Sequence, residues 1–366
     1  MKNRVFAIIL IISFFSVLLI PFAVEKFAKN TTFEKSKENR NLARMPEKFK
    51  WRKFFPALEE YYNDRIPFRT ELLHWCGKVQ RALFPIPQGN AVAGKKDFFF
   101  YQPPTWENTI EQFRGKKKLR HYELESRRNY LLELRSFLSN HNIKFMMVIA
   151  PNKIQIYPEY LPERRNYPES TDTPDRQLVR YIKMHHPDFP ILSLHKTLLK
   201  AKKHYPDALF YRADTHWSPV GAYIGAREII LHFSPELPLP PAGRFAIVKN
   251  GKKEPQDTSN QMFNGDAAVE YPEFIPDIPG GCHGKVKIIS PAYIISSNPS
   301  APDKRKVMVY RDSFFENMRP WLSACFREVH YIWSRNIDTA LVLKVQPDIF
   351  ILEYVARQVG RMPKRL

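Results

Sequence analysis

Residues 145–150 read FMMVIA, an uninterrupted apolar run that is followed directly by Pro151-Asn152-Lys153. Runs of this kind are typical of central strands in parallel sheets, because such strands are buried on both faces. A helical face of apolar residues precedes the run, formed by Leu124, Leu131, Leu134, Phe137 and Leu138. A helix that leads into a buried strand is the repeating unit of an α/β domain, so we predict that fold class.

The alternation continues along the chain. Ser218 is placed to cap a helix whose first residue is Pro219. Residues 234–300 are rich in Pro, Gly, Asn and Asp, and we predict an irregular insertion there, with short strands near 286–289. The pattern predicts a largely parallel sheet. Its further elements are strands at 98–101, 190–194, 208–211, 307–310, 329–333 and 349–355, and helices at 198–203 and from about Glu316.

The N-terminal segment predicts export. Lys2 and Arg4 precede residues 5–24, which carry no charged side chain and are long enough to cross a bilayer. We predict an uncleaved signal anchor, a single transmembrane helix within residues 1–26; a cleaved signal peptide is the alternative. Residues 27–93 then form a stalk and helical lead-in, with an amphipathic helix at 72–83, and residues 94–366 form the α/β domain.

The charge balance has to be interpreted with this segment in mind. Lys plus Arg (57) exceed Asp plus Glu (37), for a net charge of +20 over 366 residues. Basic charge alone indicates solubility and non-specific attraction, not a partner. Because the N-terminal segment exports the remainder, we expect no nucleic-acid partner, and an acidic polysaccharide or a membrane surface is a better candidate.

Cysteine and histidine spacing does not predict a metal or a redox pair. Cys76, Cys282 and Cys325 lack a CxxC pattern. One pair could form a disulfide after export, or all three could be buried thiols. His185-His186 and Cys282-His283 lack convergent ligand spacing, so we expect no metal site and no cofactor.

Two stretches could carry chemistry. The first is 211–217, YRADTHW, where Asp214 can fix the tautomer of His216 and leave its other nitrogen as a base; a capping Asp beside a structural His is the alternative. The second is 307–315, VMVYRDSFF, which sets Ser313 at the carboxyl end of a strand, where ligand sites of α/β sheets lie. There, main-chain amides of the turn could stabilise an oxyanion, or Ser313 could simply cap a helix.

Taken together, these motifs resemble the AlgX/AlgJ family of alginate O-acetyltransferases, whose catalytic domain is SGNH-hydrolase-like. The resemblance spans roughly residues 35–357, and Asp214-Thr215-His216-Trp217 matches the family's DTHW signature. The other matching segments, in family order, are residues 38–43 with Pro46, 62–65 with 67–69, 94–101, 151–153 with 157–158, 312–314 and 347–354. The family implies a three-layer α/β/α domain with a mostly parallel sheet.

The resemblance also implies roles for individual residues. Ser313 would be the nucleophile, His216 the general base and Asp214 the residue that orients it. This chain departs from the family at Arg311, which stands where a Gly commonly precedes the Asp-Ser pair. Because the sequence ends at Leu366, we also expect no counterpart of the carbohydrate-binding module of AlgX-type members.

Four further residues are candidates for substrate contact. Arg311 could assist with an anion, and Tyr310 precedes it. Arg212 could hold the Asp214 loop or contact a substrate carboxylate, or could be a solvated surface residue. Trp217 could stack on a sugar, although we favour a Trp that locks the loop into the core.

We therefore predict a periplasmic O-acetyltransferase, anchored in the bacterial inner membrane by one pass, that acts on an exported polysaccharide such as alginate. The acetyl donor would be a membrane-bound O-acyltransferase, and further partners would be polysaccharide-synthesis proteins. Two alternatives remain open. A polysaccharide acetyl-esterase would use the same triad, and a non-catalytic polysaccharide-binding or assembly protein would keep only the fold.

Overall fold

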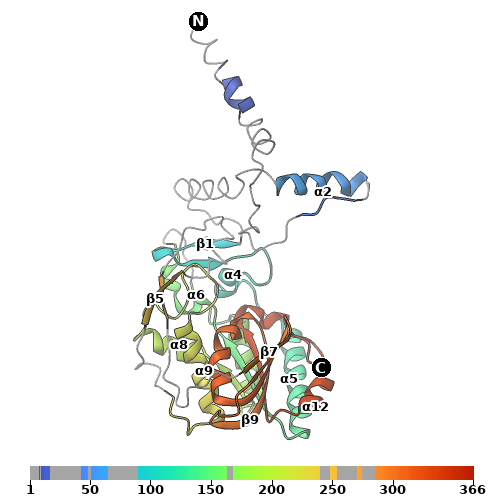
Figure 1. Cartoon of the computed structure of the whole chain (residues 1–366), viewed down its shortest axis with the longest axis vertical. Coiled ribbons are helices and arrows are strands. Elements are labelled where there is room, and N and C mark those ends of the chain that lie inside the picture. Colours follow the sequence, from blue (N-terminus) through green and yellow to red (C-terminus); the bar gives the residue numbers. More distant parts are fainter. Residues whose placement is uncertain are drawn as a thin grey trace. The chain divides into compact units, whose positions relative to one another are not determined.

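The computed structural model describes residues 8, 10–16, 43–47, 51–64, 90–162, 168–239, 248–253, 270–273 and 285–366 (Figure 1). The chain divides into two compact units. One consists of residues 1–86 with 259–267, and the other of residues 87–258 with 268–366. The larger unit holds every element of the α/β domain.

The described part of the smaller unit is helical. Residues 8 and 10–16 are helical, and α2 spans Trp51–Asn63. Just after α2, the Asp64 carboxylate accepts a hydrogen bond from the main-chain amide of Ala43 at 2.7 Å. The predicted anchor within 1–26 falls largely outside the described residues, as does the predicted helix at 72–83. In the part of the chain that is described, no helix combines the length and apolar character needed to cross a bilayer.

The larger unit is built on a mixed sheet with the strand order β4-β3-β11-β9-β10-β8-β7 among the described residues. The first five strands of this order run parallel, whereas β8 and β7 join antiparallel at one edge. The predicted α/β fold class is confirmed, and the sheet is mixed. The strands are β3 (Lys144–Ala150), β4 (Ile191–Ser193), β7 (Lys285–Ser290), β8 (Tyr293–Ser297), β9 (Asp303–Arg311), β10 (Phe326–Trp333) and β11 (Ile349–Val355).

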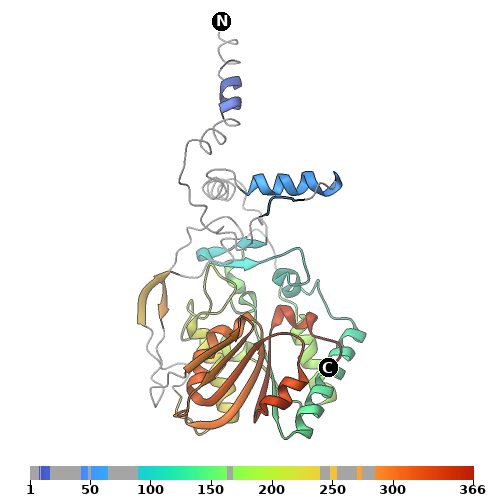
Figure 2. The ribbon, with the colours of Figure 1, turned by 45° about the vertical axis from the view of Figure 1, so that its right-hand side comes forward.

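Helices cover both faces of this sheet, as the alternation of side chains along β3 requires. Met146 and Val148 face one apolar core, and Met147 and Ile149 face the other. Figures 1 and 2 show the sheet between the two helical layers. The first core is covered by α8 (His195–Lys202), α9 (Pro219–Phe233) and α11 (Arg319–Cys325), and the second by α5 (His121–Asn140), α7 (Pro174–His185) and α12 (Thr339–Val345).

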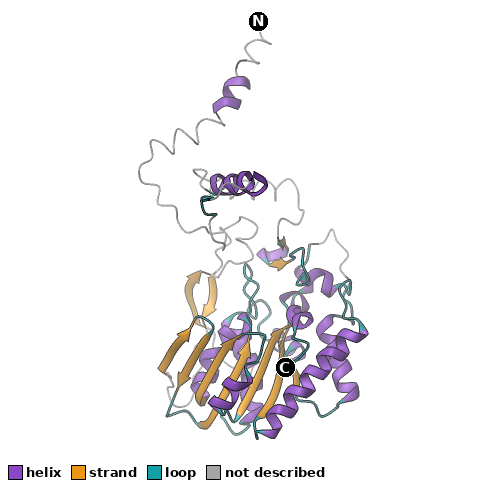
Figure 3. Ribbon diagram, turned by 90° about the vertical axis from the view of Figure 1, so that its right-hand side faces the viewer, coloured by secondary structure: helices purple, strands orange, loops and turns teal. Residues whose placement is uncertain are grey.

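Short elements cover the edge where the parallel strands end. Ser218 caps α9 as predicted, because its side chain accepts a hydrogen bond from the Gly221 amide. Figure 3 distinguishes these short strands and helices by colour. They are β1 (Ala91–Ala93), η1 (Lys95–Asp97), β2 (Phe99–Tyr101), α4 (Thr109–Phe113), α6 (Lys153–Ile156), η2 (Pro158–Tyr160), η3 (Ser313–Met318) and η4 (Ala356–Arg361).

Three sequence predictions need correction. Residues 208–211 form no strand, and only a single bridge joins Phe210 to Trp217. The stretch 234–300 contains more regular structure than expected. Within it, β7 and β8 extend the central sheet, and β5 (Val248–Lys253) pairs with β6 (Glu270–Glu273). The helix expected from about Glu316 begins earlier, as the 3₁₀ helix η3 at Ser313.

Candidate active site

The candidate site lies at the edge where the parallel strands end. Neighbouring strands β3, β11 and β9 run in the same direction, so the residues that follow them gather at one edge. Lys153 follows β3, Arg357 follows β11, and Ser313 follows β9. The fold therefore brings together residues from three distant parts of the sequence.

Residues 211–217 form a tight loop whose backbone is bound by Lys153. The buried Lys153 ammonium donates hydrogen bonds to the carbonyl oxygens of Tyr211 at 2.9 Å, Arg212 at 2.8 Å and Asp214 at 2.6 Å. These bonds satisfy three carbonyl groups that a strand would otherwise pair, and so fix the loop backbone. The sequence motif around Lys153 does not predict its hydrogen bonds to this loop, which depend on the fold.

Asp214, His216 and Ser313 form a hydrogen-bonded chain. His216 Nδ1 lies 2.6 Å from Asp214 Oδ1, and His216 Nε2 lies 2.8 Å from Ser313 Oγ. Asp214 Oδ1 also accepts the main-chain N–H of His216 at 2.8 Å, which fixes the carboxylate against the ring. This geometry orients the imidazole so that Nε2 faces the serine hydroxyl.

The electrostatics of Asp214 favour its ionised form. Burial raises the pKa of this carboxyl, but the hydrogen bond from His216 and the nearby charges of His216 and Lys153 outweigh burial, and the pKa of Asp214 lies below its ordinary value. The side chain is 6% exposed, against 24% for His216. A carboxylate is therefore available to hold the imidazole in one orientation.

Trp217 fastens the loop to the serine segment. It is fully buried, its indole N–H donates to the Phe314 carbonyl at 2.8 Å, and its own carbonyl accepts from the Asn317 side chain at 2.9 Å. A side chain buried in this way has no face for a sugar, so the predicted substrate contact is wrong, and Trp217 instead locks the loop into the core.

Ser313 is the first residue of η3, and the preceding residue, Asp312, fixes its position. The buried Asp312 carboxylate accepts the Phe314 amide at 2.8 Å and the Val355 amide at 2.7 Å, which ties the end of β9 to the end of β11. The Phe314 amide is thereby engaged, so this amide of the turn is not available to an oxyanion. Asp312 thus positions Ser313, a role that the motif alone did not reveal.

Neither Arg311 nor Tyr310 is available for the predicted substrate contact, because both side chains are buried. Arg311 is 4% exposed, pairs with Glu316 at 2.9 Å and stacks over the Trp333 ring at 4.8 Å. Tyr310 is buried in the core on the opposite face of the sheet, where its hydroxyl accepts the Asp338 amide at 3.0 Å. Successive strand residues face opposite sides, which separates Tyr310 from the serine.

Arg212 is half-buried, with its guanidinium 5.8 Å from the Phe98 ring centroid, and remains a candidate for substrate contact. A second arginine, Arg357, lies close to the serine and was not signalled by any motif. Its guanidinium lies 4.9 Å from the ring centroid of Phe314, the residue after Ser313. Among the described residues, no group of three or more His, Cys, Asp or Glu side chains could hold a metal ion.

An α/β/α sandwich that carries these three residues at the carboxyl edge of its sheet defines an SGNH-hydrolase-like domain. The family described as the SGNH hydrolase-like domain of the acetyltransferase AlgX matches residues 92–273, which include Asp214 and His216. These matches place residues 92–273 in the AlgX/AlgJ family.

Individual relatives are distant. The chain is 24% identical over 211 residues to a probable alginate O-acetylase AlgJ of Pseudomonas fluorescens. This match covers 57% of this chain and 49% of the relative. It is 23% identical over 195 residues to a probable alginate O-acetylase AlgJ of Azotobacter vinelandii. That match covers 53% of this chain and 46% of the relative. The chain thus spans about half the length of these relatives.

Among solved structures, PatB1 of Bacillus cereus is similar in fold. The TM-score is 0.54 at 13% identity, and the match covers 74% of this chain and 96% of PatB1. At this identity the likeness concerns the fold alone.

Proposed function

We propose that the protein is an O-acetyltransferase that acetylates hydroxyl groups of an exported polysaccharide through an acyl-serine. The observation that carries the proposal is the Asp214–His216–Ser313 chain, with contacts of 2.6 and 2.8 Å. The relatives named as probable alginate O-acetylases support the transfer of acetyl groups to a polysaccharide.

In the first half-reaction, Ser313 Oγ attacks the carbonyl carbon of an acetyl donor while His216 Nε2 takes the hydroxyl proton. The Asp214 carboxylate stabilises the imidazolium that forms. The tetrahedral intermediate then collapses, the bond to the donor breaks, and the leaving group takes the proton from His216. The product is an acetyl ester on Ser313.

In the second half-reaction, a sugar hydroxyl takes the place of the leaving group. His216 Nε2 accepts its proton, the sugar oxygen attacks the acetyl carbon, and Ser313 Oγ departs and recovers the proton. The sugar keeps the acetyl group, and the enzyme returns to its starting state.

The setting of the reaction is part of the proposal. The uncharged segment 5–24 behind Lys2 and Arg4 would anchor the chain in the inner membrane with the larger unit in the periplasm. A membrane-bound O-acyltransferase would bring the acetyl group across the membrane, since one spanning segment cannot move it.

The test uses the purified full-length chain, an activated acetyl ester and an oligosaccharide acceptor. The wild-type protein should transfer acetyl to the acceptor and show a mass increase of one acetyl group on the Ser313 peptide. Ser313→Ala and His216→Ala should lose at least about 10³-fold in rate. Ser300→Ala, at an exposed serine before β9, serves as the matched control and should keep full activity.

Three other outcomes would decide against the proposal. Full activity in Ser313→Ala would reject the triad. Acetate release without transfer at saturating acceptor would indicate the esterase. Polymer binding without any acetyl-enzyme would indicate the non-catalytic binding protein.

A further inference from the structure

Trp333 leaves a large aromatic side chain open to solvent at the edge of the sheet that holds the candidate site. It is the last residue of β10 and is 51% exposed, whereas Trp217 and Trp321 are 0% and 8% exposed. Trp is buried to a high degree on average, because its indole gains free energy when it leaves water. An indole that stays exposed beside a candidate nucleophile is therefore suited to a ligand that covers it.

The register of the sheet places Trp333 close to Ser313. β10 pairs with β9 so that Trp333 stands opposite Arg311, two residues before Ser313. Neighbouring strands are about 4.8 Å apart, and two residues span at most about 7 Å, so the Cα atoms of Trp333 and Ser313 lie within about 12 Å of each other. A short oligosaccharide can cover that span.

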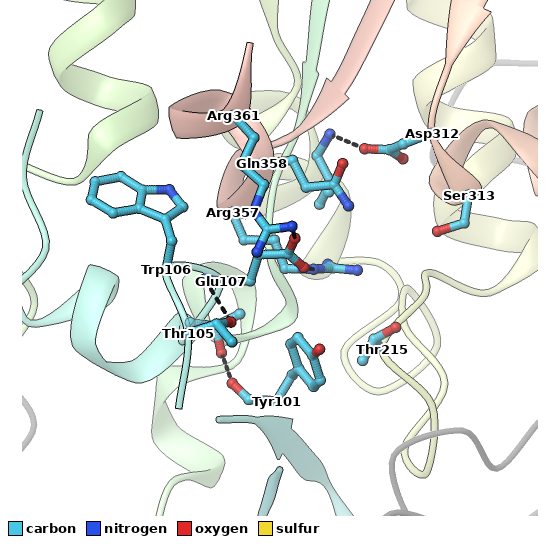
Figure 4. A network of polar contacts seen from close by, with 12 residues as sticks. Tyr101, Thr105, Trp106, Glu107, Thr215, Asp312, Ser313, Arg357, Gln358 and Arg361 are labelled. Carbon is cyan, nitrogen blue, oxygen red and sulfur yellow. Dashed lines mark hydrogen bonds and ion pairs between the residues drawn. The ribbon is translucent and has the colours of Figure 1, made fainter. Parts of the chain in front are cut away.

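The strand order gives the candidate serine two different sides. β9 lies between β11 and β10, so the residue after β11 and the residue that ends β10 flank Ser313. Figure 4 shows the side toward β11, with Arg357 between Glu107 and Ser313. On the side toward β10, the sheet ends at the exposed indole of Trp333. An acceptor chain that passes Ser313 in this direction therefore reaches an aromatic surface.

Arg311 supports one face of this indole. Its guanidinium carbon lies 4.8 Å from the centroid of the Trp333 ring, and its side chain is 2% exposed. The same guanidinium pairs with Glu316 of η3 at 2.9 Å, while its Nε has no hydrogen-bond partner among the described residues. A cation is attracted to the face of an indole and leaves the other face free. Arg311 thus connects the Trp333 ring to the helix that begins at Ser313.

The backbone of Trp333 is fixed on both sides. Its main-chain N–H donates to the carbonyl of Ala292 at 2.7 Å, in the turn between β7 and β8. On its other side it pairs with Arg311 of β9. A Trp side chain has few torsions to lose, and a preorganised aromatic surface reduces the entropy cost of binding a flexible ligand.

We propose that the free face of Trp333 is a sugar-stacking subsite, which holds a residue of the acceptor polysaccharide next to the one that Ser313 acetylates. The apolar C–H face of a sugar ring packs on the indole, while the sugar hydroxyls stay in water. Such packing needs no charge on the sugar, so the subsite favours longer acceptors. Arg311 is a positioning residue, because it acts on the acceptor only through Trp333. This inference rests on the proposed function, because it adds a subsite to that same acceptor site.

The binding experiment uses the full-length Ser313→Ala chain, which binds acceptors without turnover, with a disaccharide and a hexasaccharide of alginate. Calorimetry should show at least about tenfold tighter binding of the hexasaccharide. Trp333→Ala in this background should lose most of that difference, and Trp333→Phe should keep part of it because a ring remains. Tyr122→Ala is the matched control, since Tyr122 is 56% exposed and lies on α5, which covers the other core.

Two readouts distinguish stacking from attraction to a basic surface. The preference for the hexasaccharide should persist at high ionic strength, because salt screens charges and not apolar packing. The hexasaccharide should also shift the indole fluorescence to shorter wavelength, because it removes water from the Trp333 ring. Trp333→Phe should lack this shift.

Kinetics separate this inference from the proposed function. Trp333→Ala in the active chain should raise the KM for the hexasaccharide about tenfold and change kcat less than about twofold. Ser313→Ala should instead abolish transfer and keep the length preference in binding. Arg311→Met should raise the same KM about threefold, because the indole loses its support, and Arg311→Lys should recover part of that loss. Melting temperatures establish that each variant is folded.

Three outcomes would overturn the inference. One is an unchanged length preference in Trp333→Ala, or an equal loss in Tyr122→Ala. Another is a length preference that disappears in high salt, because the basic surface would then account for it. The third is a Trp333→Ala variant that binds the hexasaccharide normally but no longer copurifies with membrane proteins, which would assign the indole to a protein partner.

Discussion

At the residue scale, a second buried carboxyl besides Asp312 joins the serine segment to the last strand. Glu353 is 1% exposed, and its Oε2 accepts the Asp312 amide at 3.0 Å. Burial raises the pKa of Glu353 well above its ordinary value, and the negative charge of Asp312 raises it further. The folded protein therefore favours the protonated form of this side chain.

This shift predicts how stability depends on pH. A group whose pKa is higher in the folded state adds stability below its unfolded pKa, and that stability is lost as pH rises through the folded value. Glu353→Gln keeps the acceptor for Asp312 and removes the ionisation. The variant should match the wild type near pH 4 and become more stable relative to it as pH rises, by up to roughly 1.4 kcal/mol per pH unit.

Thermal unfolding followed from pH 4 to 8 checks this expectation. Glu328→Gln provides a contrast, because burial raises the pKa of Glu328 but its hydrogen bond to His330 and the charge of Lys306 bring that pKa below its ordinary value. The stability that Glu328 adds to the wild type is lost only as pH falls toward its lowered pKa, so that variant should differ from the wild type by a constant amount at neutral pH and converge with it at the acidic end. A difference for Glu353→Gln that does not change with pH would contradict the assignment.

Residue types predicted the candidate triad better than they predicted its surroundings. A short Asp-x-His loop and a serine after an apolar strand are local patterns, and the fold brings them within hydrogen-bonding distance. Tyr310 and Arg311 precede Ser313 by three and two residues, yet strand alternation places Tyr310 in the opposite core and Arg311 is buried. Arg357 follows a buried strand with no distinctive sequence pattern. Only the pairing of β11 with β9 and the contact with Phe314 place it beside Ser313.

At the element scale, the candidate site depends on how α6 supports the loop 211–217. Lys153, the first residue of α6, provides three hydrogen bonds to that loop. Lys153→Met keeps the length of the side chain and removes all three. We expect a loss of about 3 kcal/mol or more in the free energy of unfolding and at least a tenfold fall in acyl-transfer rate, because Asp214 and His216 lose their fixed backbone.

Urea unfolding and transfer kinetics at a temperature where the variant is folded provide the measurement. Lys202→Met is the control, since Lys202 also donates to a carbonyl group, that of Ile156, and is 23% exposed. Its activity should stay close to that of the wild type. Equal effects in both variants would mean that the loop does not depend on Lys153.

The elements that the sequence predicted correctly have strong local signals. Apolar runs mark β3, β9 and β11, and a Ser-Pro pair marks the start of α9. Residues 208–211 have a strand-like composition, but Lys153 takes the Tyr211 carbonyl and only a bridge to Trp217 forms. The hairpin of β7 and β8 was missed as part of the sheet because β7 is exposed along its length and lacks the pattern of a buried strand.

At the scale of the whole molecule, the charge and the N-terminal segment belong to one argument. In a cytoplasmic protein, a net charge of +20 would suggest a nucleic-acid partner. If residues 5–24 act as an anchor, however, most of that charge lies outside the cytoplasm.

The anchor can be tested by fractionation. The full-length chain should be recovered with membranes after alkaline washing, whereas a chain of residues 27–366 directed to the periplasm should be soluble. N-terminal sequencing of the membrane form should begin at Met1 or Lys2. A start near residue 25 would indicate cleavage and reject the anchor.

The strand order has a consequence for how the protein is made. β11, the last strand in the chain, inserts between β3 and β9 in the middle of the sheet. A growing chain therefore cannot close its sheet, and Asp312 has no Val355 amide to bind until residue 355 has been made. Premature termination or clipping near the C-terminus would remove the centre of the molecule and not its margin, so only completed chains can present an assembled site.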